Sequence, residues 1–496
     1  MASCAPFVVR GARIVDGSGG PPTRGDLRVG ADGRVAAVGP SLSPAEGEAV
    51  VDGAGLALSP GFVDLHSHSD LYALQRTGTA APVGDAPKLL QGCTAQVFGQ
   101  DGVSAAPVAD GDRADFAASI AGLDGTIGEA AWTWRSFGEY LSALRGSAST
   151  RVAALVGHST VRRLVMGLAD RPPTPDELER MGAAVDTAMA EGALGLSSGL
   201  VYVPAAYAGT GELVALCRVV AARGGRFFVH VRSESDRVVE ATREVLEVAR
   251  RSGVHLHYSH IKTAGRANWP RIGAMLELIE EYRAAGVTVT ADVHPYTAGS
   301  TTASVLLPPW MLEGGHAPAM RRLADPGARA RARDQILSDT TSWDNWWAFS
   351  GGWGGLVVAG ARRPGAAGRS FLDLVTGAGV ADPRSPEAFD VVFELLESEE
   401  LAASLISFNN VEENVARFIS QPWAGVGSDA IVNPDGHPHP RLYGTFPRVL
   451  SRYVRELGAM DLAGAVRAMT SGAAAAAGWG SAAAGRAAAP GRLAPG

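Results

Sequence analysis

Eight short β-rich runs, separated by longer amphipathic or alanine-rich stretches, make up most of the chain from Gly61 onward. This alternation is typical of parallel sheets, in which a helix returns the chain after each strand. Eight such strands are enough to close a β/α barrel. We expect the strands at residues 62–68, 94–99, 152–158, 193–198, 227–231, 255–260, 287–293 and 424–429.

Three segments fall outside this alternation. Residues 1–60 combine short β-like runs with Gly, Pro and Asp turns, which predicts a small antiparallel β unit. Residues 308–386 contain a Pro-Pro pair, an Arg/Ala-rich stretch and the run SWDNWWAFSGGWGG, and we expect them to form an insertion over the mouth of a barrel spanning 61–470. The tail at 471–496 is rich in Ala and Gly, which predicts little order.

The amino-acid composition indicates which kinds of binding partner and which compartment to expect. The net charge of −7 offers no basic surface for a nucleic-acid backbone, so a small molecule is the expected partner. The three cysteines, Cys4, Cys93 and Cys217, form no CxxC pair, which favours a reducing compartment. No apolar stretch is long enough to span a bilayer and no signal-like N-terminus is evident, so we expect a soluble, cytoplasmic protein without a membrane partner.

Histidines close several of the predicted strands. His66 and His68 end the run GFVDLHSH two residues apart, so both imidazoles project from one face of the strand. His230 and His260 each end a further β run, and their spacing of 260 − 230 = 30 residues fits one strand–helix–strand unit. Strands of a barrel end at the same rim, where catalytic groups collect. The sequence therefore predicts a metal site, most simply for zinc, built from these four imidazoles.

Asp429 ends the last predicted strand, in the run AGVGSD. A carboxylate at this rim can bind a metal weakly and accept a proton from water. A competing motif is GLSSG at 195–199, which matches the G-x-S-x-G turn of serine hydrolases. That turn must open a helix at once, and the following LVYVPAAY is a poor helix start, so we treat a serine hydrolase as a minor alternative.

Seven motifs in order resemble the N-acyl-D-amino-acid deacylases (D-aminoacylases) of the amidohydrolase superfamily. They are GFVDLHSHSD, SSGLVYVPAAYA, FVHVRSES, YSHIK, PYTAGST, GVGSDA and HPHPRLYGTF. The resemblance implies an α/β fold, a (β/α)8 TIM-like barrel with a small β-sandwich domain built from the N-terminal and C-terminal segments. It also implies hydrolysis of an N-acyl-D-amino acid to a carboxylate and a D-amino acid, by metal-bound hydroxide with Asp429 as general base and then acid.

The resemblance further implies the ligand roles. His230 and His260 match the ligands of a tight zinc site, and His66, His68 and Asp429 match those of a weaker one. Family members commonly carry Gly-Asn-Cys-Gly after the second strand, whereas this chain has Gly99-Gln100-Asp101-Gly102. Asp101 thus occupies the place of the metal-binding thiolate. The resemblance implies one or two Zn²⁺ ions. Because a carboxylate is a harder ligand than a thiolate, the metal preference could shift from the family's, so other divalent transition metals could also bind.

The substrate-binding residues also follow from the resemblance. Lys262, Tyr296, Ser300 and Arg441 match positions that grip the free carboxylate of the substrate, and Tyr202 is placed to help polarise the scissile carbonyl. Lys262 is one of only two lysines, with Lys88, in a chain that otherwise uses arginine. It lies two residues beyond His260 and so shares its face, which favours a specific role for a compact ammonium.

Two departures keep alternatives open. The thiolate is replaced, and relatives continue past GRLAPG with a strand that completes the small domain, so 471–496 reads as a truncated remainder of that domain. One alternative is a cyclic amidohydrolase acting on hydantoin-like or dihydroorotate-like rings, which needs no clamp for a free carboxylate. Another is a catalytically silent metal-binding homologue.

Overall fold

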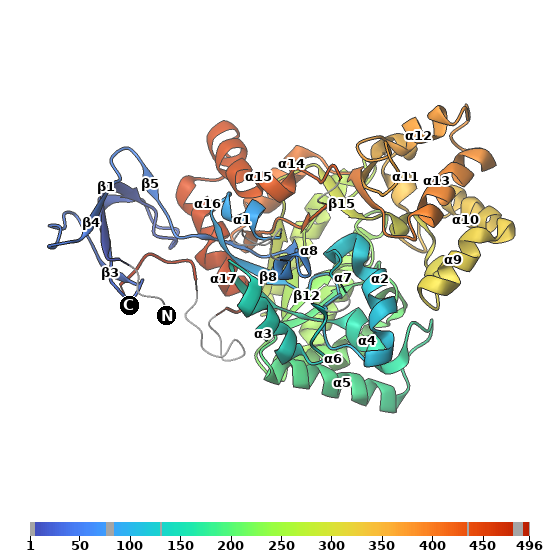
Figure 1. The fold of residues 1–496 in the computed structure, drawn as a ribbon, viewed down its shortest axis with the longest axis horizontal. Helices are drawn as coiled ribbons and strands as arrows, with labels where there is room; N and C mark the ends of the chain where they lie inside the picture. Colours follow the sequence, from blue (N-terminus) through green and yellow to red (C-terminus); the bar gives the residue numbers. More distant parts are fainter. Residues whose placement is uncertain (1–4, 76–83, 129–130, 434–435, 480–489, 496) are drawn as a thin grey trace.

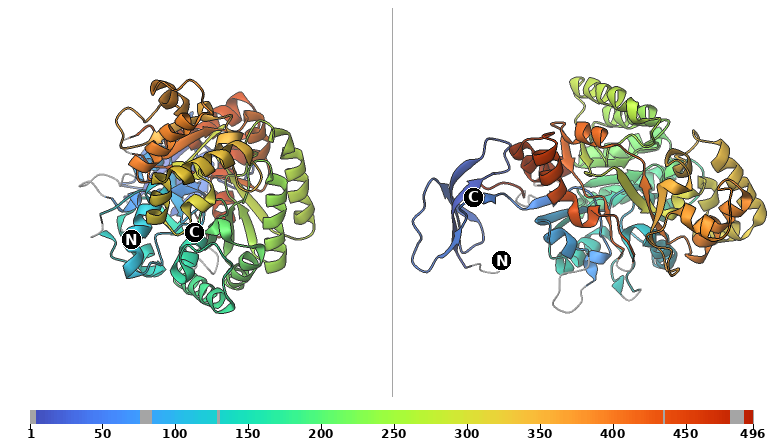
Figure 2. Two further views of the ribbon diagram at one scale, coloured as in Figure 1. Left: turned by 90° about the vertical axis from the view of Figure 1, so that its right-hand side faces the viewer. Right: turned by 90° about the horizontal axis from the view of Figure 1, so that it is seen from above.

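The structure, a computed structural model, describes residues 5–75, 84–128, 131–433, 436–479 and 490–495. Three parts lie along its longest axis, with a small β-sheet at one end, a barrel in the middle and a mostly helical insertion at the other end (Figure 1). The barrel lies between the other two parts in the view from above as well (Figure 2).

Parallel strands form the barrel, and the predicted eight-stranded arrangement is confirmed. The strands are β6 (Phe62–Asp64), β8 (Cys93–Phe98), β9 (Arg151–Ala154) continued by β10 (Val156–Gly157), β11 (Gly195–Gly199), β12 (Arg226–His230), β13 (His255–Tyr258), β14 (Val289–Val293) and β18 (Ala424–Val426). Each pairs in parallel with its neighbour in this order. The N–H of Leu65 donates to Val426 O at 3.3 Å, which joins the last strand to the first.

Helices surround the barrel, and several of them pack an apolar stripe against its strands. They are α1 (Ala86–Leu89), α2 (Arg113–Asp124), α3 (Phe137–Ser147), α4 (His158–Met166), α5 (Pro175–Ala190), α6 (Thr210–Ala222), α7 (Val238–Ser252), α8 (Ile272–Ala284), α14 (Glu412–Ile419), α15 (Arg441–Arg448) and α16 (Leu462–Met469). Helix α7 is representative, since Val238, Val245 and Leu246 are fully buried whereas its other face carries charge. It ends at Gly253, whose φ of +76° is the left-handed conformation that glycine adopts easily.

The N-terminal sheet is mixed, which corrects the prediction of an antiparallel unit. Its strands are β1 (Phe7–Ile14), β2 (Thr23–Val29), β3 (Val35–Gly39), β4 (Ala49–Asp52) and β5 (Ala57–Leu58). Strand β1 pairs antiparallel with β2 but parallel with β4 and β5, because the chain crosses back before each of these two strands. Leu493 returns to this sheet, where its N–H donates to Asp16 O and its side chain packs against the small apolar core.

The segment after Thr470 is more ordered than its composition suggested. Residues 471–477 form α17 (Ser471–Ala477), and its buried alanines join one apolar cluster with Val63 and Leu65 of the barrel. Small side chains allow this helix to approach the strands closely. The expectation of little order is therefore wrong for this helix; residues 480–489 and 496 lie outside the described part of the chain.

The insertion extends beyond the predicted range of 308–386. It contains an antiparallel sheet in the order β15 (Ala298–Thr302), β17 (Ser404–Phe408), β16 (Leu356–Gly360), with β17 as its central strand. Its helices are α9 (His316–Ala324), α10 (Pro326–Ser338), α11 (Trp346–Phe349), α12 (Phe371–Gly377) and α13 (Pro386–Ser398). Aromatic side chains such as Trp353, Phe371 and Phe389 give it a core of its own.

Candidate metal centre

Two groups of potential metal ligands meet at the C-terminal ends of the barrel strands. The first contains His66, His68, Asp101 and Asp429, and the second contains Asp101, His230 and His260. All six side chains are buried, and within each group one ligand atom per residue lies within 4.8 Å of the others. Asp101 belongs to both groups, so its carboxylate stands between two sets of imidazoles.

Each of these residues ends a strand or follows one closely. His230 is the last residue of β12, and His260 and Asp429 lie two and three residues beyond β13 and β18. Asp101 lies three residues beyond β8, and His68 ends the two-residue strand β7 (Ser67–His68), which pairs with β19 (Ala430–Ile431). The barrel rim thus gathers residues that are more than 360 positions apart in the chain.

The spacing of the ligand atoms fits a small cation. A zinc ion with bonds of about 2.0–2.1 Å in tetrahedral geometry places its ligand atoms about 3.3 Å apart. His66 Nε2 lies 3.3 Å from His68 Nε2 and 3.6 Å from Asp101 Oδ1. His260 Nε2 lies 3.0 Å from His230 Nδ1 and 3.4 Å from Asp101 Oδ1. Asp101 Oδ1 is buried without a hydrogen-bond donor, a costly arrangement that a bound cation relieves. The residues present therefore fit a divalent metal.

Backbone strain concentrates at the same place. Five described non-glycine residues have positive φ, and three of them are Asp101 at 52°, His260 at 34° and Asp429 at 51°. A non-glycine residue in this region costs on the order of 1–3 kcal/mol, and such residues cluster at functional sites. The surrounding strands therefore hold Asp101, His260 and Asp429 in a backbone conformation that they would not adopt without this support.

Asp292, the fourth of the five residues of β14, is a site residue that the sequence motifs did not predict. Its Oδ1 accepts the N–H of His260 at 3.0 Å, and its Oδ2 lies 3.0 Å from His257 Nε2 and 3.5 Å from His66 Nδ1. A carboxylate behind a ligating imidazole fixes the ring orientation and its tautomer. The sequence does mark Asp292, because it is the one acidic residue inside the short strand run VTADV. His257 contacts Asp292 from behind and belongs to neither group of potential ligands.

Two further carboxylates support the ligands from behind. Asp124, at the end of α2, lies 3.1 Å from His68 Nδ1. Glu234 lies 3.0 Å from His260 Nδ1 and accepts a hydrogen bond of 2.6 Å from Lys262 Nζ. No strand or motif marks Asp124 in the sequence, whereas Glu234 follows His230 by four residues in the run HVRSE.

Electrostatics keep the two ligand carboxylates ionised. Burial raises the pKa of Asp101, but His260 and His66 outweigh it and hold this pKa well below its usual range. Burial likewise opposes ionisation of Asp429, but Arg441 and His260 lower its pKa well below the usual range. Both groups are thus carboxylates at neutral pH.

The two imidazoles of the second group differ in charge. Burial lowers the pKa of His230 to about 4, so its ring is neutral. Burial and Lys262 also lower the pKa of His260, but Asp101 and Glu234 raise it to about 10. Asp101 and Glu234 thus favour a proton on His260, which a divalent cation would replace.

Three of the predicted substrate-binding residues line a cavity of about 20 Å³ beside the ligands. These are Lys262, Ser300 and Tyr202. Lys262 Nζ donates to Glu234 Oε1 at 2.6 Å, which leaves ammonium hydrogens for another acceptor in the cavity. Ser300 Oγ is buried and has no hydrogen-bond partner among the described residues.

The other two predicted substrate-binding residues lie behind the site. Arg441 is fully buried, and its guanidinium donates to Asp429 Oδ2 and to Ser300 O, each at 2.7 Å. The Tyr296 hydroxyl donates to Pro440 O at 3.3 Å, and its ring packs edge-on against His439. Neither residue is part of the described lining of the small cavity.

The GLSSG motif has a structural role. It forms β11, and a turn follows instead of a helix, as the sequence suggested. Ser197 Oγ donates to Gly99 O at 2.5 Å and accepts the N–H of Gly102 at 3.1 Å, so it holds the turn that carries Asp101. Ser198 Oγ is buried against His158, whose other ring nitrogen lies 2.8 Å from Glu212.

Residues 49–333 match the family model described as Amidohydrolase family. A D-aminoacylase from Alcaligenes xylosoxydans xylosoxydans is 35% identical over 469 residues, which cover 94% of this chain and 83% of the relative. The chain belongs to the amidohydrolase family, among the N-acyl-D-amino-acid deacylases. Within this family, an N-acyl-D-glutamate deacylase from the same organism is 34% identical, with 94% of this chain and 81% of the relative covered.

Solved structures of deacylases share the fold. The crystal structure of N-acyl-D-glutamate deacylase from Bordetella bronchiseptica, in complex with zinc and a phosphonate inhibitor, matches with a TM-score of 0.77 and 32% identity. That match covers 99% of this chain and 88% of the other. A crystal structure of D-aminoacylase matches with a TM-score of 0.78, 32% identity and the same coverage.

None of the helices in the described part of this deacylase combines the length and apolar character needed to cross a bilayer.

Proposed function

We propose that the protein hydrolyses the amide bond of N-acyl-D-amino acids at a centre that holds one or two zinc ions. The observation that carries this proposal is Asp101, whose carboxylate belongs to both ligand groups. The related proteins with the names D-aminoacylase and N-acyl-D-glutamate deacylase support the substrate class, and the zinc in the structure of the latter supports the metal.

In this proposal, His230, His260 and Asp101 hold one ion, and His66, His68, Asp101 and Asp429 offer a second site. Zinc bound here supplies Lewis-acid polarisation of the amide carbonyl and makes water acidic enough to attack near neutral pH. All other steps fall to side chains of the chain.

Asp429 is the proton carrier. Its carboxylate is ionised, and Arg441 fixes one oxygen, Oδ2, while Oδ1 faces His68 at 3.4 Å. It takes a proton from the attacking water and returns it to the leaving nitrogen as the amide C–N bond breaks. The products are a carboxylate from the acyl group and the free amine of the D-amino acid.

Lys262, Ser300 and Tyr202 orient the substrate. The ammonium hydrogens of Lys262 that do not donate to Glu234, and the free hydroxyl of Ser300, suit the α-carboxylate. Tyr202, whose hydroxyl lies 2.8 Å from Thr301 Oγ1 and whose ring lies 5.4 Å from that of His230, suits the acyl carbonyl. Arg441 and Tyr296 act from behind the site in this arrangement.

Zinc analysis combined with a substrate panel tests the proposal. The panel contains N-acetyl-D-leucine, its L-enantiomer, N-acetyl-D-glutamate and hydantoin. We expect bound zinc and preferential hydrolysis of the N-acetyl-D-amino acids. Bound zinc without turnover of any linear amide would favour a silent homologue, and turnover of hydantoin alone would favour a cyclic amidohydrolase.

A further inference from the structure

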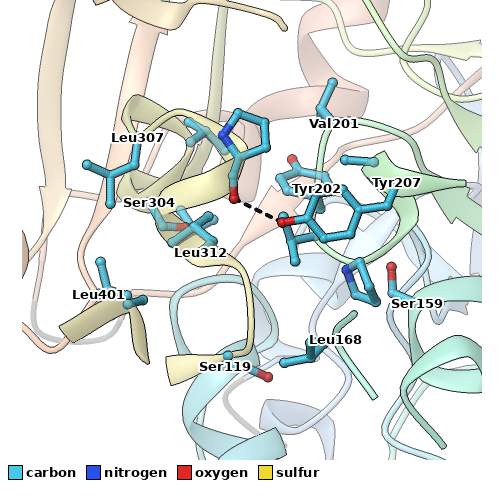
Figure 3. Close-up of a pocket in the computed structure, with 18 of the residues that line it drawn as sticks. Ser119, Ser159, Leu168, Val201, Tyr202, Tyr207, Ser304, Leu307, Leu312 and Leu401 are labelled. Atoms are coloured by element: carbon cyan, nitrogen blue, oxygen red, sulfur yellow. Dashed lines mark hydrogen bonds between the residues drawn. The ribbon is translucent and has the colours of Figure 1, made fainter. Parts of the chain in front are cut away.

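A second cavity, of about 370 Å³, lies between the barrel mouth and the insertion. This volume is within the usual range for sites that bind small organic molecules. Residues from α2, from the turn after β11 and from the insertion line it, and Figure 3 shows side chains from these elements around the space. The hydroxyl of Tyr207 donates to Pro309 O at 3.0 Å and ties the barrel side of the wall to the insertion (Figure 3). We call this space the apolar cavity.

The wall is mostly aliphatic and aromatic. Its apolar side chains include Phe116, Leu123, Leu168, Val201, Leu307 and Leu312. An apolar group that leaves water for such a wall gains free energy roughly in proportion to its area. The cavity therefore suits an apolar group.

The two arginines in the described lining are already neutralised. Arg163 forms ion pairs with Asp112 and Asp115. Arg232 pairs with Glu244 and also donates to the carbonyl oxygens of Ala206 and Ala208. A carboxylate that entered the cavity would have to displace one of these partners, so the wall disfavours an acidic group.

The apolar cavity adjoins the metal centre on the side of Tyr202. Leu123, Tyr202 and Trp346 line both this cavity and the small cavity beside the ligands. Lys262 and Ser300 line the small cavity alone. A substrate whose carboxylate lies on Lys262 and Ser300 and whose carbonyl lies near Tyr202 therefore has its acyl end next to the apolar cavity.

We infer that the apolar cavity is the binding site for the acyl chain, and that the substrates carry a medium-length or long aliphatic acyl group. This inference rests on the proposed hydrolysis of N-acyl-D-amino acids. The first test measures kcat/KM for N-acyl-D-alanines from acetyl to octanoyl. Burial of each added methylene is expected to raise kcat/KM about fourfold until the cavity is filled. A flat or falling series would overturn the inference.

Cavity-filling variants test whether the dependence of kcat/KM on acyl-chain length arises in the apolar cavity. Leu312→Trp, from the insertion side, is expected to lower the octanoyl-to-acetyl ratio of kcat/KM at least tenfold and to leave N-acetyl-D-alanine within about twofold. Leu168→Trp fills the space from the barrel side and serves as a second variant. Leu372→Trp is the matched control, because Leu372 is a half-buried leucine of the insertion outside the described cavity lining. An equal loss in the control and in both cavity variants would overturn the inference.

A second substrate series separates the acyl chain from the amino-acid side chain. If N-acetyl-D-amino acids gain with side-chain size and Leu312→Trp removes that gain, the cavity holds the side chain and the inference is wrong. Absence of turnover of every linear amide would contradict the proposed function instead. In that case, calorimetry compares the binding of octanoate with that of acetate. Tighter binding of octanoate that is lost in Leu312→Trp supports the assignment of the cavity to the acyl chain. Equal binding of the two acids overturns it.

Discussion

The guanidinium of Arg441 bridges Asp429 Oδ2 and the main-chain oxygen of Ser300, each at 2.7 Å. It joins the proposed proton carrier to the strand that presents a proposed substrate ligand. Because Arg441 is fully buried, the bridge sets the position of the Asp429 carboxylate and lowers its pKa.

Arg441→Lys keeps the charge but cannot span both oxygens. We expect kcat to fall about 10-fold to 100-fold through misplacement of Asp429, with KM changed less than about threefold. Steady-state kinetics check this, with Arg448→Lys as the control because Arg448 lies over the Tyr296 ring behind the site. A large rise in KM at unchanged kcat would instead indicate that Arg441 grips the substrate carboxylate.

Asp101→Asn tests the shared carboxylate. Asparagine tolerates the left-handed φ of 52°, so the substitution removes charge with little change of backbone strain. We expect the zinc content to fall by about one ion per chain or the zinc affinity to fall at least about tenfold. A competitive chelator titration measures both. Unchanged content and affinity would show that the histidines and Asp429 hold the metal without Asp101.

Asp292→Asn removes the carboxylate behind His66 and His257. Loss of such a support typically costs about 10-fold to 100-fold in metal affinity. The same chelator titration checks it, and Thr290→Val on the same strand is the control, since Thr290 contacts His255 and His257 but no ligand of either group. An affinity equal to that of Thr290→Val would argue against a role for Asp292 in the site.

Asp344 gives a pH dependence that is separate from the metal ligands. Burial raises its folded-state pKa to about 6 from 3.8, although Ser233 and Ser235 donate hydrogen bonds to it. The folded chain therefore binds more protons than the unfolded chain between about pH 4 and 6, and the contribution of Asp344 to stability is lost as pH rises through about 6. When the pH is raised from 4.5 to 7.5, Asp344→Asn should therefore gain about 2 kcal/mol of stability relative to the parent protein.

Melting temperatures of both proteins at the two pH values measure this relative gain. Asp339→Asn, in the same insertion, should show none. Burial raises the pKa of Asp339, but hydrogen bonds from Ser342 and Thr341 outweigh it and lower the pKa to about 2. A difference between parent and Asp344→Asn that is constant with pH would contradict the assignment.

The barrel and most of its rim could be predicted because both depend on local pattern. An apolar run ended by His230 or Asp429 indicates a strand and its C-terminal end together, and barrel closure then brings such ends to one place. Asp292 could have been found by the same reasoning, since an acidic residue inside an apolar barrel strand needs a buried partner.

The features that could not be predicted from the sequence depend on contacts between segments that are distant in the chain. The run 404–408 is the central strand of the insertion because it pairs with β15 and β16, which are distant in the chain. The contact of Arg441 with Ser300 joins residues 141 positions apart, which no periodicity encodes. The alanines of α17 suggested low complexity, yet their small size is what allows the helix to pack on the barrel.

The most direct test of the whole account compares zinc-loaded parent protein with Asp429→Asn on N-acetyl-D-leucine. Zinc content is measured in the same samples, because His230, His260 and Asp101 should retain at least one ion in the variant. We expect the parent to hydrolyse this substrate and kcat in the zinc-containing variant to fall about 10²-fold to 10⁴-fold. Near-parental turnover by Asp429→Asn, or no turnover of any N-acyl-D-amino acid by the zinc-loaded parent, would contradict it.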